Sequence, residues 1–194
     1  MRNRETTSDI ADHAQWLNQY YFLRAAFSVA WVIAAFAIAP SSAVVAAALL
    51  VAYPAWDAAA NYLDALCSGG LNQNRTQGVN VLVSLATTIA VILALQVSMN
   101  WVLGIFGAWA ILSGLLQLGT AVRRWKLFGA QWAMVLSGGQ SALAGGFFIF
   151  QATMPAAPSI ANVAGYAAVG ALYFLVSALW LTVSTWRRSA AGES

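Results

Sequence analysis

The stretch Val79–Ser98, with the sequence VNVLVSLATTIAVILALQVS, decides the fold class of this chain. It holds 20 residues and no charged side chain. A helix rises 1.5 Å per residue, so a stretch of this length spans about 30 Å, the thickness of the hydrocarbon core of a bilayer. The whole chain has a matching composition, 61% apolar and 8% charged. Soluble domains carry about 25% charged residues. We therefore predict a membrane protein.

Five further apolar stretches have the same character. They lie at 22–39, 43–66, 101–121, 130–150 and 160–186. Each is long enough for a helix that crosses the hydrocarbon core. We predict an all-α membrane protein with one domain of six transmembrane helices over residues 22–188. Residues 1–21 form a cytoplasmic or interfacial segment, and residues 189–194 a short tail.

The basic residues all fall on one side of the predicted membrane. They lie before the first stretch, near its start, or after an even-numbered stretch: Arg2, Arg4, Arg24, Arg75, Arg123, Arg124, Lys126, Arg187 and Arg188. The opposite loops, around 40–42, 98–100 and 151–159, contain no charged residue. Because cytoplasmic loops are enriched in Lys and Arg, we predict that both termini are cytoplasmic. These flanks carry the net charge of +3, which favours membrane lipids with anionic head groups over nucleic acid as partners.

The N-terminal segment has an amphipathic pattern of its own. Ile10, Ala14, Leu17 and Tyr21 follow one another at the spacing of a single helix face. A short amphipathic helix of this kind lies in the membrane interface. We predict such a helix in residues 1–21, leading into the first span.

The apolar stretches repeat along the chain. A shift of 56 residues places the first stretch on the third and the third on the fifth, so that Ala30, Ala86 and Ala142 coincide. The same shift places Ser28 on Ser84. Two spans per repeat give every repeat the same orientation in the membrane. We predict three parallel, pseudo-repeated helical hairpins around an axis along the membrane normal.

Small residues recur at four-residue spacing in the odd-numbered stretches. They are Ala26, Ala30 and Ala34, then Ala86 and Ala90, then Gly138, Ala142 and Gly146. In stretch 101–121 we assign the same role to Gly104, Gly107, Gly114 and Gly119. Small residues let the backbones of two helices approach closely in a membrane. We predict that these positions are buried between helices. A groove for a lipid or a substrate is the alternative use of the odd-numbered faces.

Two acidic residues, Asp57 and Asp64, lie within the stretch 43–66. With Tyr53 and Asn61 they follow at spacings of four, four and three residues, which places all of them on one face of a helix. Ionisable groups inside a membrane are costly, face the bundle interior and mark functional sites. We take these residues, with Arg24 as a basic partner, as a candidate polar and pH-responsive site. In the alternative interpretation Arg24 anchors the topology and the acidic residues are structural polar contacts.

Comparable polar positions lie in the other even-numbered stretches. The repeat matches the Tyr53–Asp64 stripe with Trp109, Ser113, Gln117 and Thr120, and with Tyr173, Ser177, Leu181 and Ser184. Three such stripes turned towards one axis would form a small polar core. Pro54 lies in the first stripe and is expected to bend its helix, so neighbouring groups must bond the backbone carbonyl that it frees.

The sequence lacks the residues of a catalytic or metal site. It contains one His, His13, and one Cys, Cys67, so neither a zinc site nor an intrachain disulfide can form. Ser113, Ser137 and Ser177 have no nearby His or Lys in the sequence that would act as a base. We predict a non-enzymatic protein without a cofactor.

Several short motifs follow one another in the predicted membrane domain. They are WAILSGLLQ at 109–117, Arg123-Arg124, GAQW at 129–132, LSG at 136–138, Gly145-Gly146 and Pro155, preceded by Arg24, Pro40, Tyr53 and Asp57. In this order and spacing they resemble the HdeD-like family, small bacterial inner-membrane proteins built from a repeated helical hairpin. The chain departs from the family pattern at Ala58, where glycine is expected, and at Pro54.

The resemblance implies a bacterial inner-membrane protein linked to acid resistance or envelope stress. It implies no particular molecular activity. The residues themselves leave two alternatives open. The first is a small channel or transporter with its substrate on the Tyr53–Asp64 stripe. The second is a scaffold subunit of a homo-oligomer with an uncovered small-residue face.

Overall fold

The computed structural model describes residues 2–67, 69–124 and 131–192. Side chains are described at 15–67, 69–119, 122, 135–184, 186 and 187. Several residues singled out in the sequence lie outside this described part: His13, Thr120, the side chains of Arg123 and Arg124, Lys126 and the motif at 129–132.

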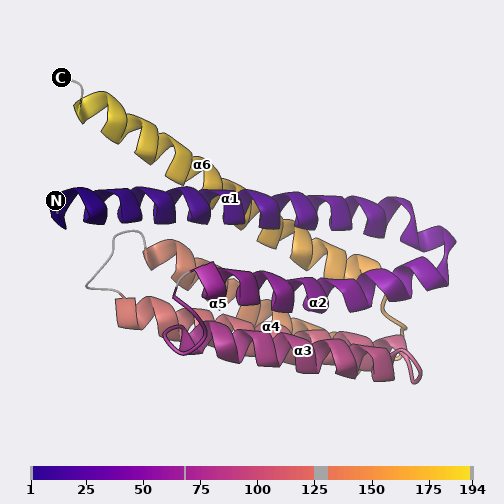
Figure 1. Ribbon diagram of the computed structural model, residues 1–194. Coiled ribbons are helices and arrows are strands. Elements are labelled where there is room, and N and C mark those ends of the chain that lie inside the picture. The colour runs from indigo at the N-terminus through magenta and orange to yellow at the C-terminus, as the bar shows by residue number, and fades with distance from the viewer. Residues whose placement is uncertain (1, 68, 125–130, 193–194) are drawn as a thin grey trace. The chain divides into compact units, whose positions relative to one another are not determined.

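Six α-helices follow one another along the chain (Figure 1). They are α1 (Arg2–Ala37), α2 (Ala43–Cys67), α3 (Arg75–Ala94), α4 (Met99–Arg124), α5 (Gln131–Ala152) and α6 (Ile160–Gly192), with a 3-10 turn, η1 (Ala39–Ser41), after α1. The described residues contain no strand, which confirms the all-helical fold. Five helices, α1 to α4 and α6, are long and apolar enough to cross a membrane. A sixth span formed by α5 and the arrangement in three hairpins stay predictions.

The N-terminal helix is longer than the first predicted span. α1 runs without a break from Arg2 to Ala37 and contains 36 residues. The predicted interfacial segment 1–21 and the predicted first span are therefore parts of one continuous helix. Its apolar, membrane-spanning portion covers 15–41 when η1 is included.

The described contacts divide the chain into two compact units, each of which we describe by itself. One unit joins residues 1–30 to residues 167–194. In it the Nδ2 of Asn18 donates a hydrogen bond to the Oγ1 of Thr182 over 3.0 Å. The ring of Tyr21 stacks on that of Phe174 with centroids 6.3 Å apart. Because the later α1 residue meets the earlier α6 residue, the two helices are antiparallel within this unit.

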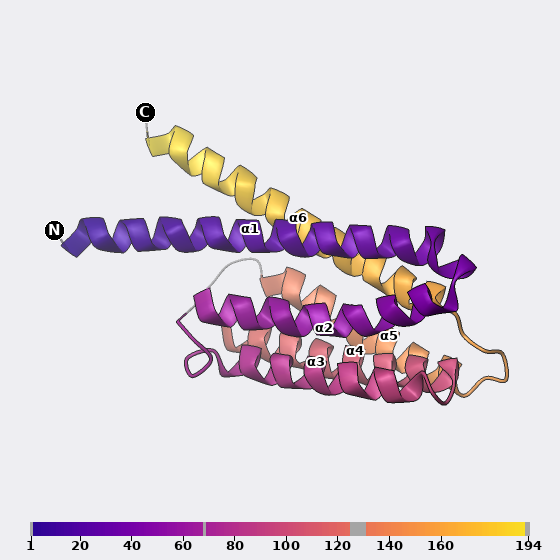
Figure 2. The same cartoon turned by 45° about the vertical axis from the view of Figure 1, so that its right-hand side comes forward.

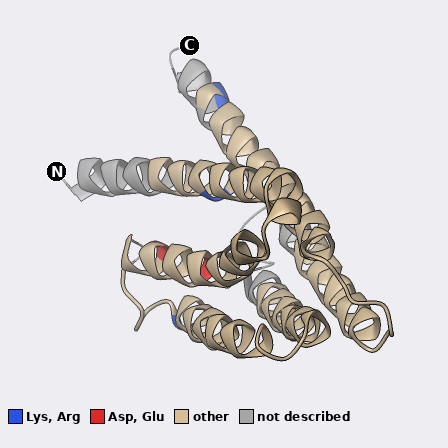
Figure 3. Cartoon of the chain, turned by 90° about the vertical axis from the view of Figure 1, so that its right-hand side faces the viewer, with Lys and Arg blue, Asp and Glu red and all other residues tan. Residues whose placement is uncertain are grey.

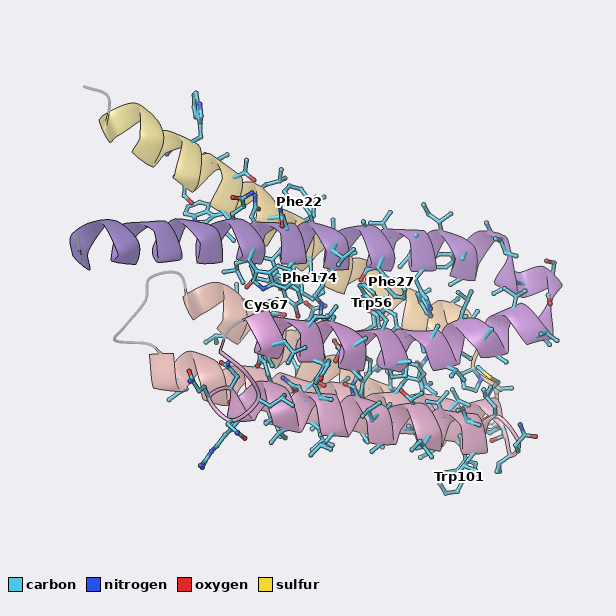
Figure 4. All side chains as sticks on the ribbon, viewed as in Figure 1. Phe22, Phe27, Trp56, Cys67, Trp101 and Phe174 are labelled. Atoms are coloured by element: carbon cyan, nitrogen blue, oxygen red, sulfur yellow. The ribbon has the colours of Figure 1, made fainter. Side chains whose placement is uncertain are left out.

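The second unit comprises residues 31–166 and contains α2, α3, α4 and α5. Helices that follow one another along the chain pack side by side, α2 on α3, α3 on α4 and α4 on α5; Figure 2 shows α2, α3 and α4 alongside one another. The core of the unit is apolar, and its largest fully buried side chains include Leu50, Val91, Val102, Leu103 and Phe106. Trp101, by contrast, points away from the helices into the surroundings (Figure 4) and is 64% exposed.

The tightest helix pair in this unit joins α4 to α5 through glycines. A Cβ atom added at Gly114 would lie 2.5 Å from the carbonyl oxygen of Gly138, and one added at Gly107 would lie 2.7 Å from that of Gly145. The two contacts run in opposite order along the helices, so α4 and α5 are antiparallel. We call these four residues the glycine seam. The predicted role of Gly107, Gly114 and Gly138 in close helix packing is confirmed.

Several other small residues do not pack as predicted. Ala26, Ala30, Ala86 and Gly146 are exposed, and a Cβ added at Gly119 or Gly146 would have nothing within 4 Å. The prediction that these residues are buried between helices is wrong at these positions. The helical period explains the error in α5, because one residue turns a helix by about 100°, so Gly146 lies well away from the face of Gly145.

The turn between α2 and α3 depends on two glycines. Gly69 and Gly70 have φ angles of 98° and 89°, in the left-handed region that glycine adopts most readily. The N–H of Gly70 donates to the carbonyl of Ala65 over 2.7 Å and so closes the end of α2. The turn places the first residues of α3 beside the last turns of α2, where Asp64 lies.

Candidate functional site at a membrane-embedded carboxylate

Helix α2 holds the predicted polar stripe. The Nδ2 of Asn61 donates to the Oδ2 of Asp57 over 2.9 Å and to the Asp57 carbonyl over 2.8 Å, as residues four apart on one helix face can. Tyr53, Asn61 and Asp64 are buried, with 7 to 9% of their surfaces exposed, and Asp57 is partly buried. Figure 3 shows that the acidic residues among the described side chains lie on α2 alone.

Helix α3 supplies the partners of both carboxylates. The Oγ of Ser84, only 1% exposed, donates to the Oδ2 of Asp57 over 2.8 Å. About two helical turns closer to the α2–α3 turn, the Nε2 of Gln77 donates to the Oδ2 of Asp64 over 2.7 Å. The acidic stripe of α2 therefore faces α3.

Helix α4 extends the contact through Trp109. Its indole Nε1 donates to the Oγ of Ser84 over 3.1 Å, and its ring meets Tyr53 edge to face at 5.8 Å. A chain of hydrogen bonds thus runs from Trp109 through Ser84 to Asp57 and joins three helices. We call Tyr53, Asp57, Asn61, Ser84 and Trp109 the Asp57 cluster. Both hydrogen bonds that reach the Asp57 carboxylate from Ser84 and Asn61 are donated to the same oxygen, Oδ2.

Aromatic rings cover the cluster on the side of the earlier α2 residues. Trp31 packs on Tyr53 at 4.7 Å, and Phe106 meets Trp109 edge to face at 5.8 Å. The indole of Trp31 also donates to the carbonyl of Leu49 over 2.7 Å. The carbonyl that Pro54 frees is the next one, that of Leu50, so the predicted partner of the freed carbonyl stays a prediction.

The predicted stripe of α4 divides between two neighbours. Trp109 bonds to α3, whereas Gln117 exchanges hydrogen bonds of 3.3 and 3.4 Å with Ser137 of α5. Between them the Oγ of Ser113 is buried and meets no hydrogen-bond partner in the described part of the chain. The predicted α6 stripe, Tyr173 to Ser184, lies in the other compact unit, so the common axis of three stripes stays a prediction.

Arg24 has contacts that the sequence did not predict. Its Nη1 donates to the Oη of Tyr20 over 2.8 Å, and its guanidinium lies 4.4 Å from the centroid of the Phe174 ring. A guanidinium over an aromatic face at this distance makes a cation–π interaction. These partners belong to the unit of 1–30 and 167–194, whereas Asp57 and Asp64 belong to the other. The pairing of Arg24 with either carboxylate therefore stays a prediction.

The sequence contained a signal for the α3 residues that was not used. Gln77, Ser84 and Val91 are spaced seven residues apart, so they lie close to one face of a helix. Ser84 and Val91 are buried, and so is Thr87 on the adjoining position. Ser84 is a polar residue at this spacing inside an apolar span, and the neighbouring helix carries acidic residues. This combination would have identified Ser84 as a partner of Asp57.

The cluster offers a carboxylate held by directed donors, which is suited to binding and releasing a proton. Within the described side chains, no three His, Cys, Asp or Glu residues come together as a metal site requires. Cys67 lies exposed at the end of α2 (Figure 4). No protein family, curated protein or solved structure matches this chain.

Proposed function

We propose that this chain is a non-enzymatic, multi-pass protein of the bacterial inner membrane, of the HdeD-like type, whose helix packing responds to acid through Asp57. One observation carries the proposal. The Oδ2 of Asp57 accepts hydrogen bonds of 2.8 Å from Ser84 and 2.9 Å from Asn61, inside helices that are apolar enough to span a membrane.

Protonation of Asp57 would weaken its contact with α3. Hydrogen bonds to an ionised carboxylate are roughly twice as strong as those between neutral groups. Neutralising Asp57 weakens the bond from Ser84, and Ser84 in turn holds Trp109 of α4. Acid therefore loosens the contact of α2 with α3 and α4. A response of this kind suits the acid or envelope stress role that the family resemblance implies.

The pH dependence of stability tests this function. The wild-type chain, Asp57→Asn and Asp64→Asn are unfolded in detergent between about pH 8 and about pH 2, a range that extends below the ordinary protonation range of an aspartate. Asparagine keeps an acceptor oxygen for Ser84 and cannot ionise. We expect the free energy of unfolding of the wild type to fall with pH, because its stronger hydrogen bonds need the ionised carboxylate. Asp57→Asn should lose the part of this dependence that the bonds from Ser84 and Asn61 contribute, and Asp64→Asn should lose the smaller part that the single bond from Gln77 contributes. A wild-type pH dependence in Asp57→Asn would refute the proposal.

A small channel or transporter is the second candidate. Polar groups continue from Asp57 through Asn61 to Asp64 and Gln77, near the α2–α3 turn. A proton or cation path of this type would give flux across proteoliposomes that Asp57→Asn abolishes. Absence of flux in the wild type, together with a pH-dependent stability carried by Asp57, favours the structural response over conduction.

The orientation of the chain in the membrane is part of the same proposal. Both termini and the α2–α3 turn are placed in the cytoplasm, on the side of the nine basic residues. Single cysteines at Ser42, Val97 and Ala157 in a Cys67→Ser background should react with impermeant thiol reagents from the periplasm. Val97 is 68% exposed and is preferred to Asn100, whose amide bonds the carbonyls of Ala152 and Met154. Labelling of these cysteines only from the cytoplasm would show that the chain has the opposite orientation.

Membrane lipids are the proposed partners of the outer surface. On α3, Leu82, Ile89 and Leu93 are 61 to 68% exposed, and apolar side chains of this kind suit contact with lipid tails. Assembly with further copies of the chain stays a proposal, which native mass spectrometry from detergent would test.

A further inference from the structure

We infer that Asp57 exchanges protons with only one side of the membrane, the side of the α2–α3 turn. This inference rests on the proposed acid response and adds the side of the membrane from which the proton reaches Asp57. The observations that carry it are the groups that surround Asp57 along the helix axes. They are apolar or aromatic towards the start of α2, apart from the buried hydroxyl groups of Tyr53 and Thr87, and polar towards its end. The Oγ1 of Thr87 donates its hydrogen to the carbonyl of Val83 over 2.8 Å.

The side towards the start of α2 is closed by the core of the unit. Leu50 of α2, Val91 of α3 and Phe106 of α4 are all 0% exposed. Tyr53 and Trp109, which lie between them and Asp57, meet edge to face at 5.8 Å. A proton moves along groups that both donate and accept hydrogen bonds, and these aliphatic and phenyl side chains do neither.

Trp109 closes the hydrogen-bond chain itself. An indole N–H donates and has no lone pair with which to accept a proton. The chain from Trp109 through Ser84 to Asp57 therefore ends at the indole and cannot pass a proton further into α4. Ser84 supports the carboxylate, and the indole fixes the direction in which Ser84 donates.

The side towards the α2–α3 turn is polar. Asn61 bonds Asp57, and Asp64 follows three residues later with Gln77 bonded to its carboxylate. Beyond Asp64, residues 71–73 of the turn are exposed. Asp64 is thus the carboxylate through which a proton would pass between the turn and Asp57.

Few other ionisable groups face Asp57 within this unit. On α2 they are Tyr53 and Asp64, and on α3 the sole ionisable residue is Arg75, exposed at its start. The described side chains of α4 and residues 31–37 of α1 include none. Protonation of Asp57 from the turn therefore involves Asp64 before any other carboxylate. With the proposed orientation, Asp57 responds to the pH of the cytoplasm.

Infrared spectroscopy of oriented proteoliposomes tests the inference. Vesicles with the α2–α3 turn facing outward and vesicles with it facing inward are prepared, and only the outer medium is acidified. The carboxylic acid band that is present in the wild type and lost in Asp57→Asn reports protonation of this residue. We expect the band when the turn faces the acid and no band when it faces the lumen. Equal bands from both sides, or a band from the opposite side alone, would overturn the inference.

Two variants and one titration complete the experiment. Phe106→Ala opens the apolar side and should let Asp57 be protonated from there, whereas Trp101→Ala, an exposed position on the same helix, should not. If Asp57 is protonated from the side of the turn alone in both variants, the aromatic core is not the barrier.

Titration in detergent exposes both sides of the protein at once and tests the proposed acid response alone. A band that is absent even there refutes the proposed function, whereas a band in detergent with two-sided access refutes only the inference.

Discussion

The glycine seam and the Asp57 cluster both attach α4 to a neighbouring helix, but by different forces. In the seam, Gly114 and Gly138 bring two backbones so close that an added Cβ would lie 2.5 Å from a carbonyl oxygen. In the cluster, the indole of Trp109 reaches α3 through a hydrogen bond of 3.1 Å to Ser84, which bonds the Asp57 carboxylate. In a membrane, dispersion holds the first contact and directed polar bonds hold the second.

This difference determines which contact can respond to its surroundings. The seam consists of backbone and hydrogen atoms, and no proton or small ligand changes its strength. The cluster ends in an ionisable group, so its strength depends on the protonation of Asp57. We therefore regard α4 and α5 as the fixed part of the 31–166 unit and the contact of α2 with α3 and α4 as the adjustable part.

Substitution in the seam should have the largest effect. A Cβ at Gly145 would lie 2.7 Å from the Cγ1 of Ile111 and 2.9 Å from its backbone nitrogen, so Gly145→Leu forces the helices apart. We expect a loss of about 3 kcal/mol, at the upper end of the range for overpacking. Unfolding in detergent with increasing denaturant measures it.

Gly146 provides the matched control one residue away. A Cβ at Gly146 would have nothing within 4 Å, so Gly146→Leu should leave stability unchanged or raise it. The four-residue spacing in the sequence predicted a buried position at Gly146 and did not include Gly145. Equal destabilisation by the two variants would contradict the seam.

Removal of the carboxylate should have the second largest effect. Asp57→Leu leaves the buried Ser84 hydroxyl without its acceptor, whereas the Asn61 amide keeps its bond to the backbone carbonyl of residue 57. An unsatisfied buried donor costs about 1–3 kcal/mol, so we expect a loss of about 2 kcal/mol at neutral pH. Asp57→Asn retains an acceptor and should lose less. A neutral effect of Asp57→Leu on denaturant unfolding would show that the cluster does not join the helices.

The sequence predicted the class of fold and the α2 part of the site. Charge-free stretches such as Val79–Ser98 predict spanning helices, because hydrocarbon penalises every charge in the same way. The spacing of Tyr53, Asp57, Asn61 and Asp64 predicts a common face, because it depends only on the helical period. Both predictions use local information.

The α3 part needed information about which helix faces another. The repeat of 56 residues indicated Trp109 of α4, which is in the cluster, but it did not indicate Ser84, which lies on α3. Alanine gave a similar error, because alanine suits an exposed helix face as well as a packed one, and Ala86 is exposed. Gly145 and Gly146 are adjacent in the sequence, and their different roles follow from the rotation of α5 against α4.

Removal of a single hydrogen bond that does not involve Asp57 should have the smallest effect on stability. The Oη of Tyr166 bonds the Oγ of Ser141 over 3.1 Å between α6 and α5. Tyr166→Phe keeps the ring that packs on Phe148 and removes the hydroxyl group that makes this bond. We expect a loss of about 0.6 kcal/mol, the average for such bonds in membrane proteins. A loss as large as that of Asp57→Leu would remove the distinction between this contact and the Asp57 cluster.

The coupling between Asp57 and Ser84 at two pH values tests the central claim most directly. A double-mutant cycle with Asp57→Ala, Ser84→Ala and the double variant isolates the energy of this pair from other effects. We predict a favourable coupling at about pH 8 that falls to about half or less at about pH 2, where the carboxyl is neutral, because the neutral acid is the weaker acceptor. A coupling of zero, or one that is the same at both pH values, would contradict an acid response carried by Asp57.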